Sequence, residues 1–363
     1  MLTRLYIDNF RCFVNFEYKP ARRQLILGGN GTGKSSFMDA LLFLRQFVLK
    51  GDLLDDHLIL SQRTRWLTQP RMTWEMEAAI EGATHLYRLE IEPWGEPPRP
   101  RVVSETLQCD RKPIVEFTSG EVRLFDDRFE HKVTYDFDWH RSALATITER
   151  KNNQAVARFR RWLGGVYCLR INPFAMASRT EDEHLHTNSD LSNFASWYRH
   201  LRQEHPKLDA AMLESLRTAL EGFSYLQFES YGERVRLLTA EFGRGTKFHF
   251  SELSDGQRCL ICLYAILHFV LATGRMVVLD EPENFVSLRE IQPWLMAAAD
   301  TVEEAEGQLL LISHHPEILN QWAPGGVRFV REGAGPVRVV EFHGDPASPL
   351  TASELVARGW ERE

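Results

Sequence analysis

The sequence predicts an α/β fold, and three short apolar segments distributed along the chain carry this prediction. Each segment is an uninterrupted or nearly uninterrupted apolar run that ends in polar or glycine residues, a pattern typical of buried strands. The first segment is followed by a glycine-rich loop and then by apolar residues at helical spacing. The three segments are residues 24–27, 276–279 and 309–312.

The loop after the first segment reads GGNGTGKS and fits the phosphate-binding template G-x-x-x-x-G-K-[ST], with Gly28, Gly33, Lys34 and Ser35 at its fixed positions. Glycine residues let backbone N–H groups turn inward toward a phosphate. Lys34 can reach the β- and γ-phosphates, and the Ser35 hydroxyl can bind Mg²⁺. A helix over residues 36–49 is expected directly after the loop, with its N-terminus toward the same anion. The sequence therefore predicts a phosphate site with Mg²⁺.

The composition is ordinary for a globular protein of one or two domains, with 363 residues, 44% of them hydrophobic and 26% charged. No stretch approaches the ~20 apolar residues of a membrane span, and the start lacks the apolar core of a secretory signal. The net charge of −7 excludes a protein that is basic all over, so nucleic-acid binding would need a local patch. Five scattered cysteines favour reduced thiols and a cytoplasmic location.

The first third of the chain is predicted to form an antiparallel β layer beside the glycine-rich loop. Residues 2–13 are interpreted as an edge strand that runs into a turn, and residues 71–91 as a hairpin. Residues 102–139 offer three or four further short strands. Residues 148–162 then predict a helix rich in arginine, which is either a patch for nucleic-acid phosphates or, as we favour, a solvated helix face.

The middle of the chain is predicted to be mostly helical. Two amphipathic runs over residues 191–220, separated by Pro206, indicate two helices. Short strands of a small sheet follow over residues 225–228, 235–238 and 247–250. Two groups carry metal-ligand residue types without a spacing that fixes a geometry, and we interpret both as solvent-facing. They are Asp136, Asp138 and His140, expected on one face of a strand, and Glu181, Asp182, Glu183, His184 and His186 in a loop.

A serine and a glycine stand at the start of the next predicted helix, in the sequence LSDGQ at residues 253–257. The Ser254 hydroxyl, the N–H groups around Gly256 and the positive end of the helix dipole can together grip a γ-phosphate. Ser254 can equally be an ordinary helix N-cap, so this signal depends on the others.

Two acids follow the second apolar segment, at the strand edge where ligands bind in open α/β sheets. Asp280 would hold Mg²⁺, directly or through water, and Glu281 would orient and deprotonate the attacking water. His314 follows the third segment and is a candidate sensor of the γ-phosphate, although a structural histidine is the common alternative. Glu281 and His314 are therefore the candidate catalytic residues, and Asp280 is a candidate metal ligand.

Taken together, these motifs resemble the head of an ATP-binding-cassette (ABC) ATPase, because LSDGQ differs from the LSGGQ signature of that family only at Asp255. The start LYIDNFRCF, the run DEPEN at residues 280–284 and the run SHHP at residues 313–316 resemble the RecF/SMC/OLD branch. Residues 188–223 are similar to the bacterial predicted AAA-family ATPases of phage-defence loci. Residues 285–288 read Phe-Val-Ser-Leu where that group has a Gly-Leu-His-Pro run.

The resemblance implies ATP and Mg²⁺ as cofactors and a homodimer in which two heads sandwich two ATP molecules. Each ATP would lie between the glycine-rich loop of one subunit and Ser254 and Gly256 of the other. Ser35 and Asp280 would bind the metal. The remaining residues that it assigns to the nucleotide are Arg11, Asn30, Gly31, Thr32, Gly33, Lys34, Ser36 and Gln257.

The resemblance also implies a P-loop NTPase fold with an antiparallel β layer and a helical signature lobe. The expected division is residues 1–171 and 275–345 for the nucleotide-binding lobe, 172–274 for the helical lobe and 346–363 for a C-terminal tail. Gln62 and Gln69 are both candidates for the glutamine of the Q-loop.

The function that the resemblance implies is an ATP-hydrolysing dimeric switch in phage defence. The segment after His314 is shorter than the Toprim nuclease domain of OLD proteins, so a separate effector, a nuclease, is expected as partner. A RecF/SMC-like ATPase of DNA repair or recombination that binds DNA directly is the alternative. The motor of a membrane transporter is a third class, which the start of the chain and the SHHP run disfavour.

Overall fold

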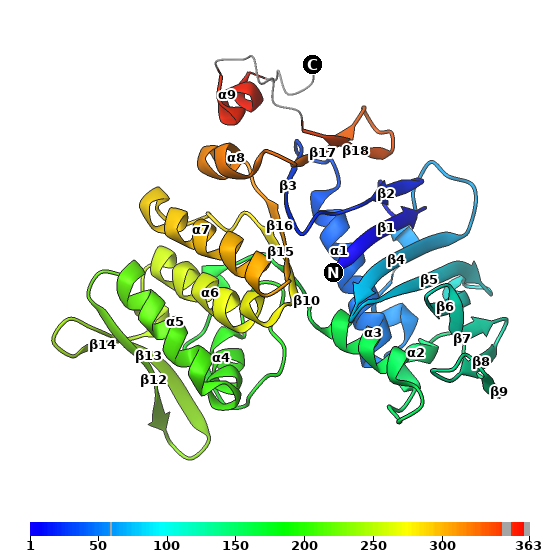
Figure 1. Ribbon diagram of the computed structural model, residues 1–363, viewed down its shortest axis with the longest axis horizontal. Helices are drawn as coiled ribbons and strands as arrows, with labels where there is room; N and C mark the ends of the chain where they lie inside the picture. The colour runs from blue at the N-terminus through cyan, green and yellow to red at the C-terminus, as the bar shows by residue number, and fades with distance from the viewer. Residues whose placement is uncertain (59, 343–349, 359–363) are drawn as a thin grey trace. The chain divides into compact units, whose positions relative to one another are not determined.

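The computed structural model describes residues 1–58, 60–342 and 350–358 and divides the chain into two compact units. The first unit contains residues 1–21, 26–166 and 327–341, and the second contains residues 22–25, 167–326 and 342–363. The chain therefore passes from one unit to the other within strand β3 (Arg23–Leu27). The helices and strands are labelled in Figure 1.

The first unit is built on an eight-stranded antiparallel sheet in the order β2-β1-β4-β5-β6-β7-β8-β9, which Figure 1 shows. This confirms the predicted β layer, including the hairpin over residues 71–91. The expectation of an edge strand over residues 2–13 is wrong, because β1 pairs on both sides and the shorter β2 forms the edge. The strands are β1 (Leu2–Asp8), β2 (Phe16–Tyr18), β4 (Met72–Ile80), β5 (Ala83–Trp94), β6 (Arg99–Cys109), β7 (Lys112–Thr118), β8 (Glu121–Phe125) and β9 (His131–Asp136).

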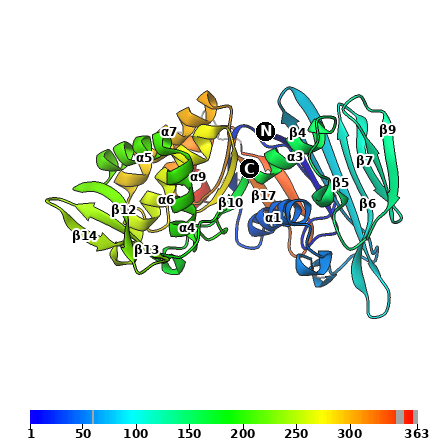
Figure 2. The ribbon, with the colours of Figure 1, turned by 90° about the horizontal axis from the view of Figure 1, so that it is seen from below.

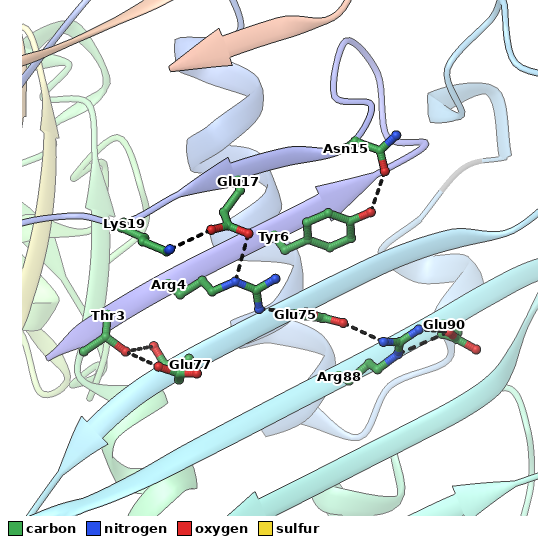
Figure 3. Close-up of polar contacts among 10 residues, drawn as sticks. All are labelled: Thr3, Arg4, Tyr6, Asn15, Glu17, Lys19, Glu75, Glu77, Arg88 and Glu90. Carbon is green, nitrogen blue, oxygen red and sulfur yellow. Dashed lines mark hydrogen bonds and ion pairs between the residues drawn. The ribbon is translucent and has the colours of Figure 1, made fainter. Parts of the chain in front are cut away.

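The two faces of this sheet follow from the alternation of apolar and polar residues along its strands. On one face, side chains such as Trp74 and Met76 are fully buried. On the other, charged side chains pair across neighbouring strands (Figure 3). The guanidinium of Arg4 lies 3.2 Å from Glu17 and 2.7 Å from Glu75, and Arg88 lies 2.6 Å from Glu75. These pairs link β2, β1, β4 and β5 and match the register of the strands.

Three helices pack on the buried face of the sheet, namely α1 (Lys34–Lys50), α2 (Ala143–Thr146) and α3 (Gln154–Gly164). Figure 2 shows α1 and α3 on the same side of it. The helix α1 confirms the helix predicted after the glycine-rich loop. The helix α3 begins six residues later than expected, since Asp127 accepts hydrogen bonds from the backbone N–H groups of Gln154 and Ala155 and so fixes its start.

A second, small group of strands completes the first unit. The end of β3 pairs in parallel with β17 (Val327–Arg331), and β17 pairs antiparallel with β18 (Val337–Glu341). The strand β9 ends at Asp136, so Asp138 and His140 follow the strand and do not share a strand face with Asp136, contrary to expectation. Two 3₁₀ turns also belong to this unit, at Leu54–Asp56 and Leu60–Gln62.

The second unit has three buried strands in the order β10-β15-β16, with β15 and β16 parallel. Every residue of these strands is buried, and β15 and β16 agree with the buried runs predicted over residues 276–279 and 309–312. A small sheet of β11, β13, β12 and β14 lies beside the helices, as predicted for residues 225–250 (Figure 1). The strands are β10 (Val166–Leu169), β11 (Arg179–Thr180), β12 (Phe223–Tyr231), β13 (Val235–Phe242), β14 (Thr246–His249), β15 (Met276–Asp280) and β16 (Gln308–Ile312).

Helices supply most of the remaining second unit, and α6 is at their centre. The helix α6 contacts α4, α5 and α7, which is why its sequence is apolar nearly all round. Residues 255–273 are long and apolar enough to cross a membrane, contrary to the sequence-based expectation, but 67% of that window is buried inside the protein. The helices are α4 (Phe194–Glu204), α5 (Pro206–Ala219), α6 (Asp255–Phe269), α7 (Leu288–Glu304), α8 (Pro316–Trp322) and α9 (Ala352–Ala357), with 3₁₀ turns at Pro173–Ala175, Phe250–Glu252 and Leu271–Thr273.

The compact units and the predicted lobes divide the chain differently. The second compact unit contains residues 275–326 together with the helices that follow residue 171. The prediction instead assigned residues 275–345 to the nucleotide-binding lobe. The predicted lobes are functional divisions and stay a prediction. The predicted tail over residues 346–363 lies partly outside the described residues, and its described part contains α9.

Candidate nucleotide and magnesium site

The glycine-rich loop joins β3 to α1, as the template requires, and its glycines are needed for steric reasons. Gly28 has a φ of 152°, and a Cβ there would lie 2.5 Å from Thr32 Oγ1 and 2.7 Å from the Phe329 carbonyl oxygen. Gly33 is the left-handed N-cap of α1 with a φ of 95°, and a Cβ there would lie 3.0 Å from Cys12 Sγ. Side chains at these two positions would therefore distort the loop.

The polar groups of the loop suit an anion. Lys34 Nζ donates hydrogen bonds to the carbonyl oxygens of Gly28 and Gly29, which places the ammonium group on the loop itself. The first backbone bond of α1 runs from Phe37 N to Gly33 O at 2.9 Å, so the N–H groups of the first turn are at the helix N-terminus. The sequence of that turn holds no acidic residue, which leaves the positive end of the helix dipole uncompensated by its own carboxylates.

The predicted nucleotide-binding residues of the first unit lie together. Asn30, Gly31 and Ser35 are exposed, whereas Thr32, Gly33, Lys34 and Ser36 are half-buried. Arg11, which only the resemblance pointed to, forms an ion pair with Asp39 on the second turn of α1. Its backbone N–H donates to the Gln62 carbonyl oxygen at 2.6 Å. The structure thus anchors Arg11 to the helix that carries Lys34 and Ser35.

A second arginine lies at the glycine-rich loop, and no sequence motif predicts it there. Arg331 Nη1, at the end of β17, donates to the Gly31 carbonyl oxygen at 3.3 Å, and its guanidinium lies 5.5 Å from the centre of the Trp66 ring. The long separation of Arg331 and Gly31 in the chain explains why sequence reasoning missed this contact. Its effect is to add positive charge beside the loop.

In the second unit, the first predicted acid is buried and already paired. Asp280 ends β15 and is only 6% exposed. The guanidinium of Arg170 binds its Oδ2 through Nε at 2.8 Å and also through Nη2. Arg170 directly follows the buried strand β10, which is the neighbour of β15 in the sheet. Sequence reasoning missed Arg170, although a charged residue after a buried strand was the available signal.

The second predicted acid is exposed and held in an unusual backbone conformation. Glu281 has a φ of 49°, and its backbone N–H donates to the Ile312 carbonyl oxygen at 2.8 Å. Its carboxylate Oε2 accepts a hydrogen bond from Asn284 Nδ2 at 2.8 Å. The exposed carboxylate is therefore positioned both by its backbone and by a neighbour in the same loop, as a general base needs.

A third acid in this loop connects it to the end of β16. The Ser313 hydroxyl donates to Glu283 Oε1, and the backbone N–H of His315 donates to Ser313 Oγ at 3.0 Å. Glu283 is buried, and burial raises the pKa of its carboxyl group above the ordinary value, while the Ser313 hydrogen bond lowers it. His314 is exposed beside this chain of hydrogen bonds. Sequence reasoning did not assign Glu283 a role.

At the start of α6, the structure contains the N-cap that was the alternative interpretation of Ser254. Ser254 Oγ accepts a hydrogen bond from Gln257 N at 3.2 Å, and Gln257 Oε1 accepts one from Ser254 N at 3.0 Å. This capping box fixes Gln257 against Ser254 and leaves Ser254 exposed. A cap and a γ-phosphate ligand are compatible roles for one exposed hydroxyl.

Gly256 is required by the loop that follows the acids. A Cβ at Gly256 would lie 2.6 Å from the Phe285 carbonyl oxygen, so only glycine permits this approach. Phe285 has a φ of 71°, the left-handed region that favours glycine, and it stands where the Gly-Leu-His-Pro run of the resembling group begins. Asp255, the departure from LSGGQ, pairs with Arg258 one turn later, and Arg258 also donates to the Pro173 carbonyl oxygen.

The other sequence candidates remain outside these two clusters. The arginines of α3 are occupied by acidic or backbone partners, since Arg158 pairs with Glu81, Arg161 with Glu149, and Arg160 donates to the Ile147 carbonyl oxygen. This pairing agrees with a solvated helix face. Within residues 1–58, 60–342 and 350–358, no group of three or more His, Cys, Asp or Glu side chains is placed to hold a metal ion.

The two Q-loop candidates both lie in the first unit. Gln69 Nε2 donates to Asp8 Oδ2 at 2.9 Å, and Gln62 holds Arg11 through its backbone, so neither contact identifies a Q-loop glutamine. Both assignments stay predictions.

The donors present fit ATP with Mg²⁺. The glycine-rich loop offers a cradle that side chains at Gly28 and Gly33 would fill, together with an ammonium group and a helix N-terminus. The predicted metal ligands, Ser35 and Asp280, are oxygen donors, the kind that Mg²⁺ prefers. Lys34 and Ser35 belong to the first unit and Asp280, Glu281, His314 and Ser254 to the second.

Comparison with known proteins identifies the fold. A family model described as "AAA domain, putative AbiEii toxin, Type IV TA system" matches residues 25–320. No curated protein matches the chain. Among solved structures, an SMC head bound to the C-winged helix domain of ScpA is similar with a TM-score of 0.57 at 12% identity, covering 94% of this chain and 98% of that one.

A second solved structure is an SMC head with an extended coiled coil, bound to the C-terminal domain of ScpA derived from Pyrococcus furiosus. It is similar with a TM-score of 0.56 at 12% identity and covers 100% of this chain and 99% of that one. The predicted fold class, an α/β P-loop NTPase of the ABC-head type, is confirmed by these matches.

Proposed function

Because the chain belongs to the AAA domain family that its matching model describes, we propose that it is the ATP-hydrolysing subunit of a defence system and works as a dimeric switch. The family is one of ATPases, and its description names a toxin of a toxin–antitoxin system, which supports a role in defence. The separate effector, a nuclease, is part of the proposal. The homodimer is also part of the proposal, because ABC heads are expected to hold ATP between two subunits.

One observation carries the ATPase proposal, namely the geometry of the glycine-rich loop. Gly33 begins α1 in the left-handed conformation, and Lys34 binds the loop carbonyls of Gly28 and Gly29. When a nucleotide binds, its phosphate oxygens offer Lys34 better acceptors than neutral carbonyls, because hydrogen bonds between charged groups are stronger. The N–H groups at the start of α1 would hold the same phosphates.

The remaining roles follow from the chemistry of each side chain. Mg²⁺, when bound, neutralises charge on the β- and γ-phosphates, and Ser35 and Asp280 would hold it. Glu281, which is exposed and oriented by Asn284, would accept a proton from the attacking water. His314 would donate a hydrogen bond to the γ-phosphate.

The exposed aromatic residues of the second unit support association with another protein. The rings of Phe174 and Phe285 contact each other with their centres 5.4 Å apart, yet they are 71% and 49% exposed. Phe285 also lies against Gly256 of the signature. Exposed large aromatic side chains are typical of surfaces that a partner buries. We assign this pair to the proposed dimer contact.

The experiment that tests the ATPase proposal is the variant Lys34→Ala. It should lose ATP binding and hydrolysis while the folded state persists, because Lys34 is half-buried at the start of α1 and is not part of the hydrophobic core. ATP binding is measured with a fluorescent analogue, and folding by circular dichroism. Lys50→Ala is the matched control, since Lys50 lies at the opposite end of the same helix. Normal nucleotide affinity in folded Lys34→Ala protein would contradict the proposal.

DNA binding separates this proposal from the alternative of a repair ATPase. The isolated protein should bind duplex DNA weakly or not at all, since the arginines of α3 are already paired. Tight binding that weakens steeply with salt would favour the alternative.

A further inference from the structure

The pair formed by Asp280 and Arg170 has a consequence for the metal site of the proposed ATPase. Asp280 is buried at the end of β15, and both Nε and Nη2 of Arg170 contact its Oδ2. A buried carboxylate without a positive partner is costly, so the guanidinium offsets the cost of burying the Asp280 side chain. The same carboxylate is the proposed ligand of Mg²⁺.

A guanidinium and a metal ion cannot both bind this carboxylate at full strength. Both are cations that approach the carboxylate oxygens, and at a few ångströms like charges repel strongly in a partly buried site. We propose that Arg170 competes with Mg²⁺ for Asp280 and acts as a gate on the metal site. This inference rests on the proposed function, because it takes Asp280 as the metal ligand.

The surroundings of Arg170 allow its side chain to leave while its backbone stays in place. The side chain is 60% exposed, whereas that of Asp280 is 7% exposed, so the guanidinium can regain water when it is displaced. The backbone is tied to a neighbouring loop, because Arg170 N donates to the Ser189 carbonyl oxygen at 2.7 Å and Asn172 N donates to that of Asp190 at 3.1 Å. The moving part is therefore the side chain.

The gate gives the metal site a selectivity that a bare carboxylate lacks. Mg²⁺ that arrives with a nucleotide brings additional phosphate ligands and can displace the guanidinium. Mg²⁺ without a nucleotide has only protein oxygens as ligands, apart from water, and has to compete with Arg170 for Asp280. Arg170 thus acts as a positioning residue for Asp280 and raises the Mg²⁺ concentration that the site requires.

The test is a titration of Mg²⁺ against Arg170→Gln. Binding of a fluorescent ATP analogue is followed as Mg²⁺ is added, and the midpoint for Mg²⁺ is compared with that of the wild type. Removing the competing charge should lower this midpoint by roughly ten-fold, the change that corresponds to a modest ion-pair energy. Arg170→Lys keeps the positive charge but loses the paired N–H donors of the guanidinium. Its Mg²⁺ midpoint should therefore lie between those of the wild type and Arg170→Gln.

Arg202→Gln is the matched control. Arg202 pairs with the buried Asp209 at 3.4 Å in the same unit, so its loss breaks a similar pair away from the proposed metal site. Its Mg²⁺ midpoint should equal that of the wild type. An unchanged or higher midpoint in Arg170→Gln would overturn the competition between Arg170 and Mg²⁺.

Binding of Mn²⁺ without nucleotide, measured by electron paramagnetic resonance, is the second readout. Arg170→Gln should bind Mn²⁺ more tightly than the wild type, and Asp280→Asn more weakly. Equal Mn²⁺ affinity in Arg170→Gln and wild type would overturn the inference. A wild type that binds no ATP would instead contradict the proposed function, and the Mn²⁺ titration would still decide the role of Arg170.

Discussion

Several features of the candidate site depend on individual atoms or on the backbone conformation of one residue. At Gly256 the missing Cβ lets the Phe285 carbonyl oxygen approach the first turn of α6. At Asp280 the two nitrogens of one guanidinium neutralise a buried carboxylate. At Glu281 a left-handed backbone and Asn284 together aim an exposed carboxylate. Each feature can therefore be tested by one substitution.

Gly256→Ala should destabilise the folded protein by about 1–3 kcal/mol, the usual cost of overpacking. The added methyl group would lie 2.6 Å from a backbone oxygen, and backbone can yield only by moving the loop that contains Phe285. Chemical denaturation of wild type and variant measures the change.

Gly164→Ala is the matched control, because the added Cβ would meet Leu49 Cδ1 at an ordinary 3.7 Å. This variant should be neutral or slightly more stable, since alanine favours helix over glycine. Equal stability changes in both variants would show that the contact between Gly256 and Phe285 is not a constraint.

At the scale of elements, a buried carboxylate joins the sheet of the first unit to the helix beside it. Glu105 on β6 accepts hydrogen bonds from Tyr87 Oη at 2.9 Å, from Ser142 Oγ at 2.6 Å and from Ala143 N at 2.6 Å. Ser142 and Ala143 are the N-cap and first residue of α2. Burial nevertheless raises the pKa of Glu105 above its ordinary value of 4.5.

The raised pKa of Glu105 predicts how stability depends on pH. The folded state keeps the proton of Glu105 at pH values where the unfolded chain has lost it. Its contribution to stability is therefore fully present below the unfolded pKa of 4.5 and is lost as pH rises through the folded pKa. Glu105→Gln removes this titration, so the stability of the wild type relative to the variant should fall as the pH rises from 4.5 through the folded pKa.

Urea denaturation across that pH range measures the difference, with Glu116→Gln on β7 as a matched loss of one carboxylate. If the free energy of unfolding of the wild type instead rises relative to that of Glu105→Gln as the pH increases, the raised pKa of Glu105 is contradicted.

Elements were easier to predict from the sequence than their contacts. The buried strands, the hairpin and the helix α1 follow from local periodicity, so they were confirmed. The start of α3 was predicted wrongly because Asp127, which fixes it, lies on a loop distant in the sequence. The partners of the acids, Arg170 and Ser313, were missed for a similar reason, since the sequence shows a polar residue after each buried strand but its pairing depends on strand order.

At the scale of the whole molecule, the proposed function requires two chains. The second unit presents Ser254 at the exposed start of α6, and it also carries the exposed rings of Phe174 and Phe285. If ATP joins two heads through this surface, hydrolysis should release them. A variant that binds ATP without hydrolysing it should therefore accumulate as a dimer.

Glu281→Gln should be that variant. It removes the proton acceptor but keeps the side chain's size and leaves Lys34, Ser35 and Asp280 unchanged, so hydrolysis should fall by ~10²-fold or more while ATP binding persists. Its mass in solution, measured by light scattering with ATP and Mg²⁺, should correspond to a dimer or an assembly of dimers.

Adding Ser254→Arg to that variant should restore the monomer, because a bulky cation at the start of α6 would block the proposed contact. Hydrolysis at the wild-type rate in Glu281→Gln would remove Glu281 from its role as base, and a dimer that forms equally without ATP would contradict the switch.

The residues that enclose the glycine-rich loop also set the order in which the proposed nucleotide site is assembled during synthesis. Phe329 and Val337 lie against Gly28 and Gly33, and β17 pairs with β3 although some 300 residues separate them, as the numbering of the paired residues Val327 and Ile26 shows. On the ribosome, the loop and α1 are translated early, but the residues that enclose the loop emerge much later. A nascent chain that stops short of β17 therefore lacks part of the enclosure of the loop, so the proposed ATP site would be complete only after residues 327–337 have been made.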